Sequence, residues 1–194
     1  MNVSVGIMEG RSSVEVELSG TFQDSSGKVY PSGRYRFTSE AALKPLDPAS
    51  FAFTLDDVTI GIGFHWERKE RQVFRGALRL IRRSNGLTVI NDLDLEEYVT
   101  SVISSEMSAS CPLELLKAHA VISRSWLKQP IGEPRVQTPS PGRQNGHEIV
   151  RWYGREAHPD FDVCADDHCQ RYQGITKAFS NTAKEGEKAL VIPW

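Results

Sequence analysis

The chain has 194 residues, of which 39% are hydrophobic and 25% charged, and its 23 Lys and Arg against 25 Asp and Glu give a net charge of −2. This is the length of one domain with enough apolar residues to bury a core. The near balance of charge excludes a strong charge-driven attraction to nucleic acid or to an anionic membrane surface. No apolar run approaches the roughly 18 residues that span a bilayer. Residues 1–7 also lack the basic and then apolar layout of a signal peptide, so we expect neither a transmembrane segment nor an export signal here.

The first ninety residues have the pattern of β-strands. Apolar side chains recur at every second position, which places one face of each strand on a core. The expected strands cover residues 3–7, 14–18, 35–37, 51–55, 58–64, 73–81 and 87–90, with turn residues between them. Asn85-Gly86, between two apolar runs, predicts a hairpin.

The apolar period changes to that of helices at Asp94. Apolar residues from 95 to 103 predict a helix that runs to about Ser105, and Asp94 with Glu97 resembles a capping box. Pro112 opens a second predicted helix, which Pro130 and Gly132 close. The two helices form a hairpin, with Glu106 at its elbow.

The remaining sequence predicts a loop followed by a small β region. Residues 129–146 are rich in proline, which is typical of a surface loop. Short apolar runs follow at 149–153, 161–163, 175–179 and 189–192. We therefore expect an α+β fold in one domain, residues 1–194. It comprises a β-rich part (1–90), a helical catalytic hairpin (91–128), a loop (129–146) and a segment with Cys, His and further strands (147–194).

Glu106 has two readings from its sequence context. A carboxylate between two helices is ordinarily a solvated terminal residue, because most carboxylates lie at the surface. A catalytic role needs a raised pKa, so that the carboxyl stays protonated near neutral pH and donates to a leaving oxygen. Ile103, Met107 and Leu113 are candidates for the apolar surround that this would require.

Three blocks of sequence resemble the SpoIID/LytB domain family of stage II sporulation protein D and amidase enhancers. They are residues 90–107, which end in Ser105-Glu106-Met107, residues 116–126, and residues 161–174 with the run Gln-Arg-Tyr-Gln-Gly. The resemblance covers about residues 87–190. His119 replaces the glutamine usual in the family, and Ser101 replaces a frequent glycine. The family continues into a Tyr-x-x-x-Cys-Gly-Gly-like portion, so we expect the domain to be truncated at its C-terminus.

The resemblance implies a lytic transglycosylase that cleaves peptidoglycan glycan strands lacking stem peptides. Glu106 would be the acid and base, and Lys117 and Arg124 on the second helix would bind sugar oxygens or the lactyl carboxylate. Gln170, Tyr172 and Gln173 would line the sugar groove, although a tyrosine in a strand is also a common core residue. The family implies a location in the cell envelope, outside the cytoplasm. The alternative is a non-catalytic peptidoglycan-binding or amidase-enhancer module, with a cell-wall amidase or another wall hydrolase as partner.

A second cluster combines imidazole and thiol groups. His158, Cys164, His168 and Cys169 lie within twelve residues, and this set of donors suits zinc. Zinc at about this place in some members of the family supports that interpretation, and four protein ligands would make the site structural. The alternatives are a Cys164–Cys169 disulfide or free thiols beside surface histidines. The third cysteine, Cys111, makes a framework of several disulfides impossible.

Overall fold

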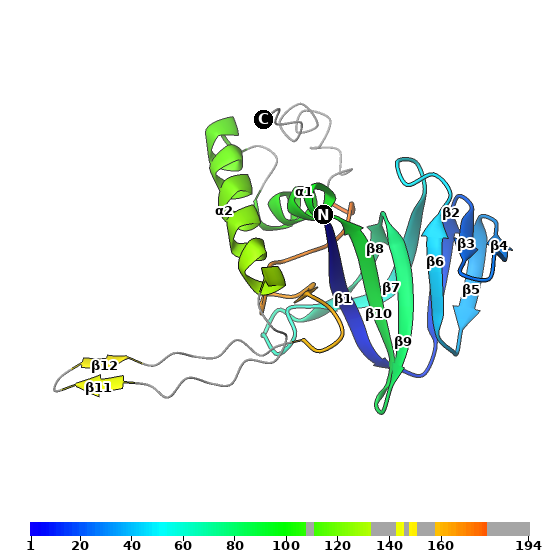
Figure 1. Ribbon diagram of the computed structural model, residues 1–194, viewed down its shortest axis with the longest axis horizontal. Coiled ribbons are helices and arrows are strands. Elements are labelled where there is room, and N and C mark those ends of the chain that lie inside the picture. The colour runs from blue at the N-terminus through cyan, green and yellow to red at the C-terminus, as the bar shows by residue number, and fades with distance from the viewer. Residues whose placement is uncertain (108–110, 133–142, 146–147, 151–157, 178–194) are drawn as a thin grey trace.

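The computed structural model describes residues 1–107, 111–132, 143–145, 148–150 and 158–177 (Figure 1). Within these residues two helices accompany two larger β-sheets and a separate two-stranded pair. The predicted α+β class and the two-helix hairpin are confirmed. The assignment of all 194 residues to one domain stays a prediction.

The larger sheet carries the edge on which the candidate site is built. Its strands are β1 (Asn2–Arg11), β3 (Phe22–Asp24), β4 (Val29–Tyr30), β6 (Ala41–Pro45), β9 (Ala77–Arg83), β10 (Gly86–Asp94) and β13 (Val163–Cys164). Their order across the sheet is β13-β1-β10-β9-β6-β3-β4. β1 pairs antiparallel with β10 and parallel with β13, so a segment from late in the chain forms the edge next to the first strand.

The second sheet packs against the same hydrophobic core. It consists of β2 (Val14–Ser19), β5 (Gly33–Phe37), β7 (Ala52–Ile60) and β8 (Arg68–Phe74), in the order β5-β2-β7-β8. Buried side chains from both sheets and both helices form one cluster, which includes Val5, Leu55, Leu80, Val102 and Leu116. Beyond this body, β11 (Arg143–Asn145) and β12 (Glu148–Val150) pair antiparallel.

Glycines change the bounds of the predicted strands. The runs expected at 51–55 and 58–64 form one strand, β7, which ends at Ile60 because Gly61 and Gly63 have φ of +69° and +79° and turn the chain. The run expected at 73–81 is two strands, β8 and β9, separated at Gly76. A Cβ on Gly76 would lie 2.5 Å from the Asp92 carbonyl oxygen. The predicted hairpin at Asn85-Gly86 is confirmed between β9 and β10.

The two helices lie on the β1 side of the molecule (Figure 1). α1 spans Leu95–Glu106, and its N-cap Asp94 accepts a hydrogen bond from the Glu96 N–H. α2 spans Leu113–Gly132. Neither of these described helices has the length and apolar character to cross a membrane. α1 ends at Glu106, so this carboxylate lies at the turn that the sequence predicted.

The later part of the chain differs in detail from the predicted loop and strands. α2 extends to Gly132, and residues 143–145 form a strand, so both intrude on the loop expected at 129–146. Residues 175–177 lie in a turn where a strand was expected. The strand predicted at 189–192 lies outside the described residues.

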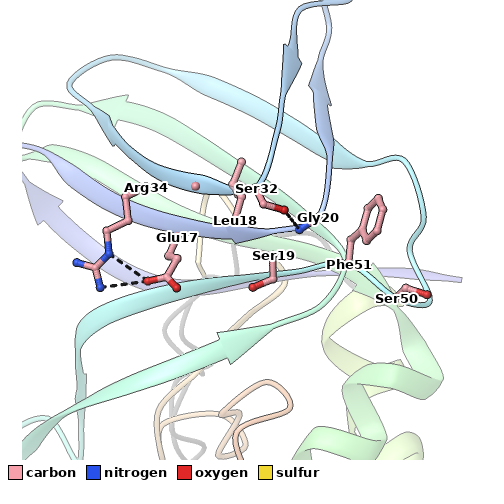
Figure 2. A pocket seen from close by; sticks show the side chains of 9 residues that line it. Glu17, Leu18, Ser19, Gly20, Ser32, Arg34, Ser50 and Phe51 are labelled. Atoms are coloured by element: carbon pink, nitrogen blue, oxygen red, sulfur yellow. Dashed lines mark hydrogen bonds and ion pairs between the residues drawn. The ribbon is translucent and has the colours of Figure 1, made fainter.

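A broad groove lies on the second sheet, away from the helices. It has a volume of about 870 Å³ and is bordered by β2, the start of β5 and residues 50–51 (Figure 2). Its polar groups bind one another: Arg34 Nε donates to Glu17 at 3.1 Å, and the Gly20 N–H donates to Ser32 Oγ at 2.8 Å. None of the site residues predicted from sequence lies along it.

Candidate functional site

Residues 158–177 follow the edge of β1 and carry most of the candidate site. β13 aligns Cys164 with Gly6, and the Ala165 N–H donates to the Gly6 carbonyl at 2.9 Å. Gly6 has to lack a side chain, because a Cβ there would lie 2.4 Å from the Phe161 ring. Asp162 completes the anchor, since its Oδ2 accepts from the Ser4 N–H and the Ser4 hydroxyl at 2.8 and 2.6 Å.

The segment brings the four predicted metal ligands together. One ligand atom from each of His158, Cys164, His168 and Cys169 lies within 4.8 Å of all the others. His168 Nδ1 is 3.8 Å from Cys164 Sγ and 3.5 Å from Cys169 Sγ, and His158 Nε2 is 3.4 Å from Cys169 Sγ. Tetrahedral zinc with ordinary Zn–S and Zn–N bonds separates a sulfur from a nitrogen ligand by about 3.6 Å. The cluster therefore has the donor set and the spacing to hold a metal ion.

The sulfur atoms are arranged as thiols and not as a disulfide. Among the residues that the structure describes, the cysteines form no disulfide. The Cys164 N–H points to Cys169 Sγ at 3.4 Å. The side-chain hydrogen bond between the two thiols, together with burial, raises the pKa of the Cys164 thiol. A bound cation would reverse this effect by stabilising the thiolate.

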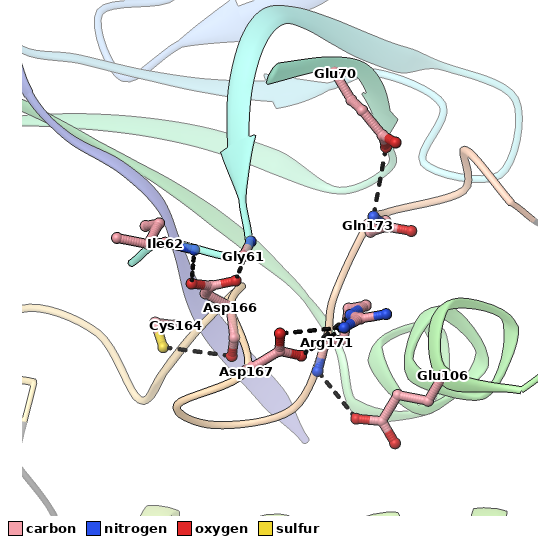
Figure 3. Close-up of polar contacts among 9 residues, drawn as sticks. All are labelled: Gly61, Ile62, Glu70, Glu106, Cys164, Asp166, Asp167, Arg171 and Gln173. Carbon is pink, nitrogen blue, oxygen red and sulfur yellow. Dashed lines mark hydrogen bonds and ion pairs between the residues drawn. The ribbon is translucent and has the colours of Figure 1, made fainter. Parts of the chain in front are cut away.

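Glu106 lies beside this segment, with both carboxylate oxygens in contact with polar groups. Its Oε1 accepts a hydrogen bond from the Arg171 backbone N–H at 3.0 Å (Figure 3). Its Oε2 lies 2.9 Å from His119 Nε2 on α2. The side chain is 30% exposed. The carboxyl therefore faces an imidazole and a backbone N–H, and the apolar surround suggested from sequence stays a prediction.

Sequence reasoning missed both of these partners. The available signal is the departure at His119, where the family that the sequence resembles has glutamine. Its side chain is 12% exposed, and its Nδ1 is buried without a hydrogen-bond partner among the described residues. Arg171 contacts Glu106 through its backbone N–H, and a sequence motif made of side chains cannot predict such a contact.

The two cations predicted to bind substrate are both engaged with carboxylates. Lys117 Nζ lies 2.8 Å from Glu114 Oε1 within α2. Arg124 reaches across to α1, where its Nε and Nη2 donate to the two Glu96 oxygens at 3.0 and 2.6 Å. Arg124 therefore ties the two helices together, whereas Lys117 lies on the helix surface.

The three residues expected along a sugar groove are buried instead. Gln170, Tyr172 and Gln173 are 8%, 1% and 2% exposed. Gln170 accepts from the Tyr98 hydroxyl at 3.3 Å, and the Tyr172 hydroxyl donates to Asn91 Oδ1 at 2.5 Å. Burial raises the pKa of Tyr172. These buried side chains therefore flank Arg171 on both sides in the chain, and none of the three lines an open groove in the described part of the structure.

Asp166 and the side chain of Arg171 connect the segment to the loop between β7 and β8. Asp166 accepts from the Gly61 and Ile62 N–H groups, each at 2.9 Å (Figure 3). Asp167 accepts two hydrogen bonds at 3.1 Å from the Arg171 guanidinium, which also lies 4.9 Å from the centre of the Trp66 ring. From sequence, Asp166-Asp167 fits either a solvated turn or a pair of oxygen ligands, whereas the structure shows both carboxylates in hydrogen bonds within the protein. Loop 61–67 was not recognised as a neighbour of the site.

Comparison with known proteins agrees with the resemblance seen in the sequence. Residues 83–191, more than half of the chain, match the family model SpoIID, described as stage II sporulation protein. An uncharacterized protein of Brachyspira hyodysenteriae is 40% identical over 53 residues, which cover 27% of this chain and 14% of that protein. No solved structure matches the chain. The family match indicates a cell-wall related role and an association with the cell envelope, and it includes Glu106 and the Cys/His cluster. The chain belongs to the SpoIID family.

Proposed function

We propose that the chain is a lytic transglycosylase acting on peptide-free peptidoglycan glycan strands, with Glu106 as general acid and base. The observation that carries this proposal is the position of Glu106. Its carboxyl is partly exposed at the end of α1, with Oε1 on the Arg171 N–H and Oε2 against His119 Nε2. A fixed carboxyl with one oxygen directed at a second titratable group suits a residue that releases and recovers a proton.

The reaction needs one proton carrier and no enzyme nucleophile. Glu106 gives its proton to the glycosidic oxygen as the bond from that oxygen to C1 of the N-acetylmuramic acid residue breaks. The C6 hydroxyl of the same sugar then bonds to C1, and its proton returns to Glu106. The products are a free 4-hydroxyl and a 1,6-anhydro end, and no water is consumed. Ordinary glycosidases need two carboxylates because water or an enzyme group attacks C1.

His119 positions the proton in this scheme. Since Oε1 accepts the Arg171 N–H, a proton bound to the pair lies between Oε2 and His119 Nε2. The imidazole also holds the carboxyl toward α2 while a sugar is bound. Glutamine, which the resemblance places here in relatives, can hold the carboxyl by an N–H bond but cannot take up a proton.

The other predicted residues divide between substrate contact and support. Lys117 is 42% exposed on α2, and we assign it the lactyl carboxylate of the substrate. Arg124 supports the site by holding α2 to α1. We assign zinc to His158, Cys164, His168 and Cys169 as a structural ion. It would fix residues 158–169 and thereby the Arg171 N–H, two residues beyond Cys169, with no part in the chemistry.

A second candidate is a peptidoglycan-binding or amidase-enhancer module without activity of its own. The observation in its favour is that Glu106 uses both oxygens within the protein. A carboxylate held in this way can serve only to join α1, α2 and residues 158–177. In that case the partner is a wall amidase or another wall hydrolase, and the family's place at the cell envelope is unchanged.

Cleavage of purified glycan strands separates the two candidates. Wild type, Glu106→Gln and His119→Gln are incubated with peptide-free strands, and the products are analysed by mass for 1,6-anhydro ends. We expect Glu106→Gln to lose about 10²-fold to 10⁴-fold of the rate, as removal of a general acid does. His119→Gln should retain activity with an altered pH profile. Equal product from wild type and Glu106→Gln, or none from wild type, would remove the enzymatic proposal.

A further inference from the structure

The loop from β7 to β8, residues 61–67, carries an aromatic pair beside the candidate site, with Phe64 exposed and Trp66 partly buried. Phe64 is 51% exposed, and its ring stacks on Trp66 with centroids 5.4 Å apart and planes at 16°. In the described part of the chain, Phe64 is the only aromatic residue among the exposed large hydrophobic side chains. Ile62 on the same loop is 61% exposed. A local concentration of exposed apolar surface marks a binding surface more often than a single exposed side chain does.

The loop holds this pair in a fixed place without burying it. Asp166 binds the Gly61 and Ile62 N–H groups at one end, as Figure 3 shows. At the other end the Gly63 N–H donates to Glu67 Oε2 at 2.9 Å. Gly61 has φ of +69°, and a Cβ there would lie 2.2 Å from the Trp66 ring, so only glycine lets the indole pack on the turn. A rigid aromatic surface loses little conformational entropy when it binds a ligand.

Arg171 joins the aromatic pair to Glu106. Its backbone N–H donates to Glu106 Oε1, and its guanidinium lies 4.9 Å from the centre of the Trp66 ring. The contacts therefore run without a break from the Glu106 carboxyl through Arg171 to Trp66 and Phe64. A long ligand held at Glu106 and following this run would meet Phe64, the exposed member of the aromatic pair.

We propose that Phe64 and Trp66 form a carbohydrate subsite that takes the apolar face of one pyranose ring of the glycan strand. The C–H groups on that face carry slight positive charge, which complements the negative face of an aromatic ring. The identity of the glycan rests on the proposed function, since peptidoglycan strands are its substrate. The loop lies outside residues 83–191, so the β-rich part of the chain supplies this subsite to the family domain.

The test measures binding apart from cleavage. The full chain with Glu106→Gln is titrated with peptide-free glycan strands by calorimetry, alone and with Phe64→Ala added. We expect the Kd to rise about tenfold with Phe64→Ala, and Phe64→Tyr to restore it, because both rings present the same face. The matched control is Leu46→Ala, which removes a side chain that is 56% exposed and follows β6, far along the sheet from β13. Unchanged melting temperatures show that the variants are folded.

Each outcome decides between the subsite and its alternatives. Equal Kd values for Phe64→Ala and Leu46→Ala overturn the subsite, even if Glu106→Gln abolishes cleavage. A Kd that depends on Phe64 in a chain that forms no 1,6-anhydro ends keeps the subsite and removes the reaction. A third arm uses vesicles of phosphatidylglycerol and phosphatidylcholine. If Phe64→Ala abolishes binding to vesicles and leaves the glycan Kd unchanged, the loop is a membrane contact and the proposal is wrong.

Discussion

Two clusters of polar side chains share the segment of residues 158–177. The Cys/His cluster ends at Cys169, the Glu106 cluster uses the backbone N–H of Arg171, and the two are built in opposite ways. The Cys/His cluster takes its four ligands from twelve residues, 158–169. The Glu106 cluster joins the end of α1, the middle of α2 and the main chain of Arg171. The first is local and is visible as a spacing in the sequence. The second exists only when three separate segments have packed together.

The Glu106 cluster nevertheless depends on the Cys/His cluster through the chain. Arg171 follows Cys169 by two residues, and its N–H is one of the two groups that hold the Glu106 carboxyl. We therefore expect any change that loosens the Cys/His cluster to displace the Arg171 N–H from Glu106. Loss of the Glu106 side chain should leave the four Cys and His side chains in place. Changes in the local cluster should therefore have larger effects than changes in the long-range one.

The largest effect is expected from a direct loss of the local cluster. Cys169→Ser removes the ligand that contacts both histidines. A metal ion at about a thousand times its Kd stabilises a fold by about 4 kcal/mol. Loss of that binding corresponds to a fall in Tm of about 8–16 °C. Metal analysis and thermal unfolding measure both effects.

The matched control for this prediction is Cys111→Ser. Cys111 is partly buried but lies outside the cluster, so its variant should keep one metal ion per chain. If Cys169→Ser also retains a full equivalent of zinc, the cluster does not bind the ion in the way described.

A smaller effect is expected when the local cluster is disturbed from β1. Gly6→Ala places a Cβ 2.4 Å from the Phe161 ring, and overpacking of this kind costs about 1–3 kcal/mol. Urea unfolding measures the loss. Adding Phe161→Ala removes the clashing ring, so the double variant should be less destabilised than the sum of the two single variants. Simple additivity would mean that the clash is relieved without moving Phe161.

The local cluster was predictable and the long-range one was not, for a physical reason. Metal ligands are few in type, so four within twelve residues are conspicuous, and helical periodicity likewise located α1, α2 and the elbow at Glu106. The contact between Glu106 and His119 depends on how α1 packs on α2, which periodicity does not give. Tyr172 was placed on a groove because an amphipathic side chain suits either a surface or a core. Only the fold, which buries its ring against Tyr98 at a centroid distance of 5.4 Å, distinguishes the two.

Tyr172, the residue next to Arg171, tests how the long-range cluster is supported from the core. Tyr172→Phe removes the buried hydrogen bond to Asn91 Oδ1, and leaving that acceptor unsatisfied should lower the free energy of unfolding by about 1–2 kcal/mol. The Kd for glycan strands, measured in the Glu106→Gln chain, should not change. A weaker Kd with unchanged stability would instead return Tyr172 to the sugar groove.

The start of α1 gives a local test within the element that carries Glu106. The hydrogen bond from the Glu96 N–H lowers the pKa of Asp94 in the folded chain. Because the folded pKa lies below the unfolded one, its stabilising contribution is present above the unfolded pKa, near 4, and is lost as pH falls. Asp94→Asn keeps a good N-cap and removes the titration, so it should flatten the stability profile below about pH 4. Asp94→Ala should lower stability by about 1 kcal/mol at neutral pH. An unchanged acid profile in Asp94→Asn would show that this carboxylate contributes nothing to it.

The smallest effects separate Lys117 and Arg124, the two cations on α2 that were predicted to bind substrate. Arg124 is 15% exposed and donates two hydrogen bonds to Glu96 on the other helix, so Arg124→Ala should lower stability by about 1 kcal/mol. The pair of Lys117 with Glu114 lies within one helix, with side chains 42% and 82% exposed, and its loss should cost less than about 0.5 kcal/mol. For substrate binding we expect the opposite order of effects. Lys117→Ala should raise the Kd for strands that carry lactyl carboxylates, and it should not change the Kd for strands whose carboxylates have been converted to neutral groups. If both variants change stability and binding together, α2 acts as one rigid support, and neither cation contacts the substrate.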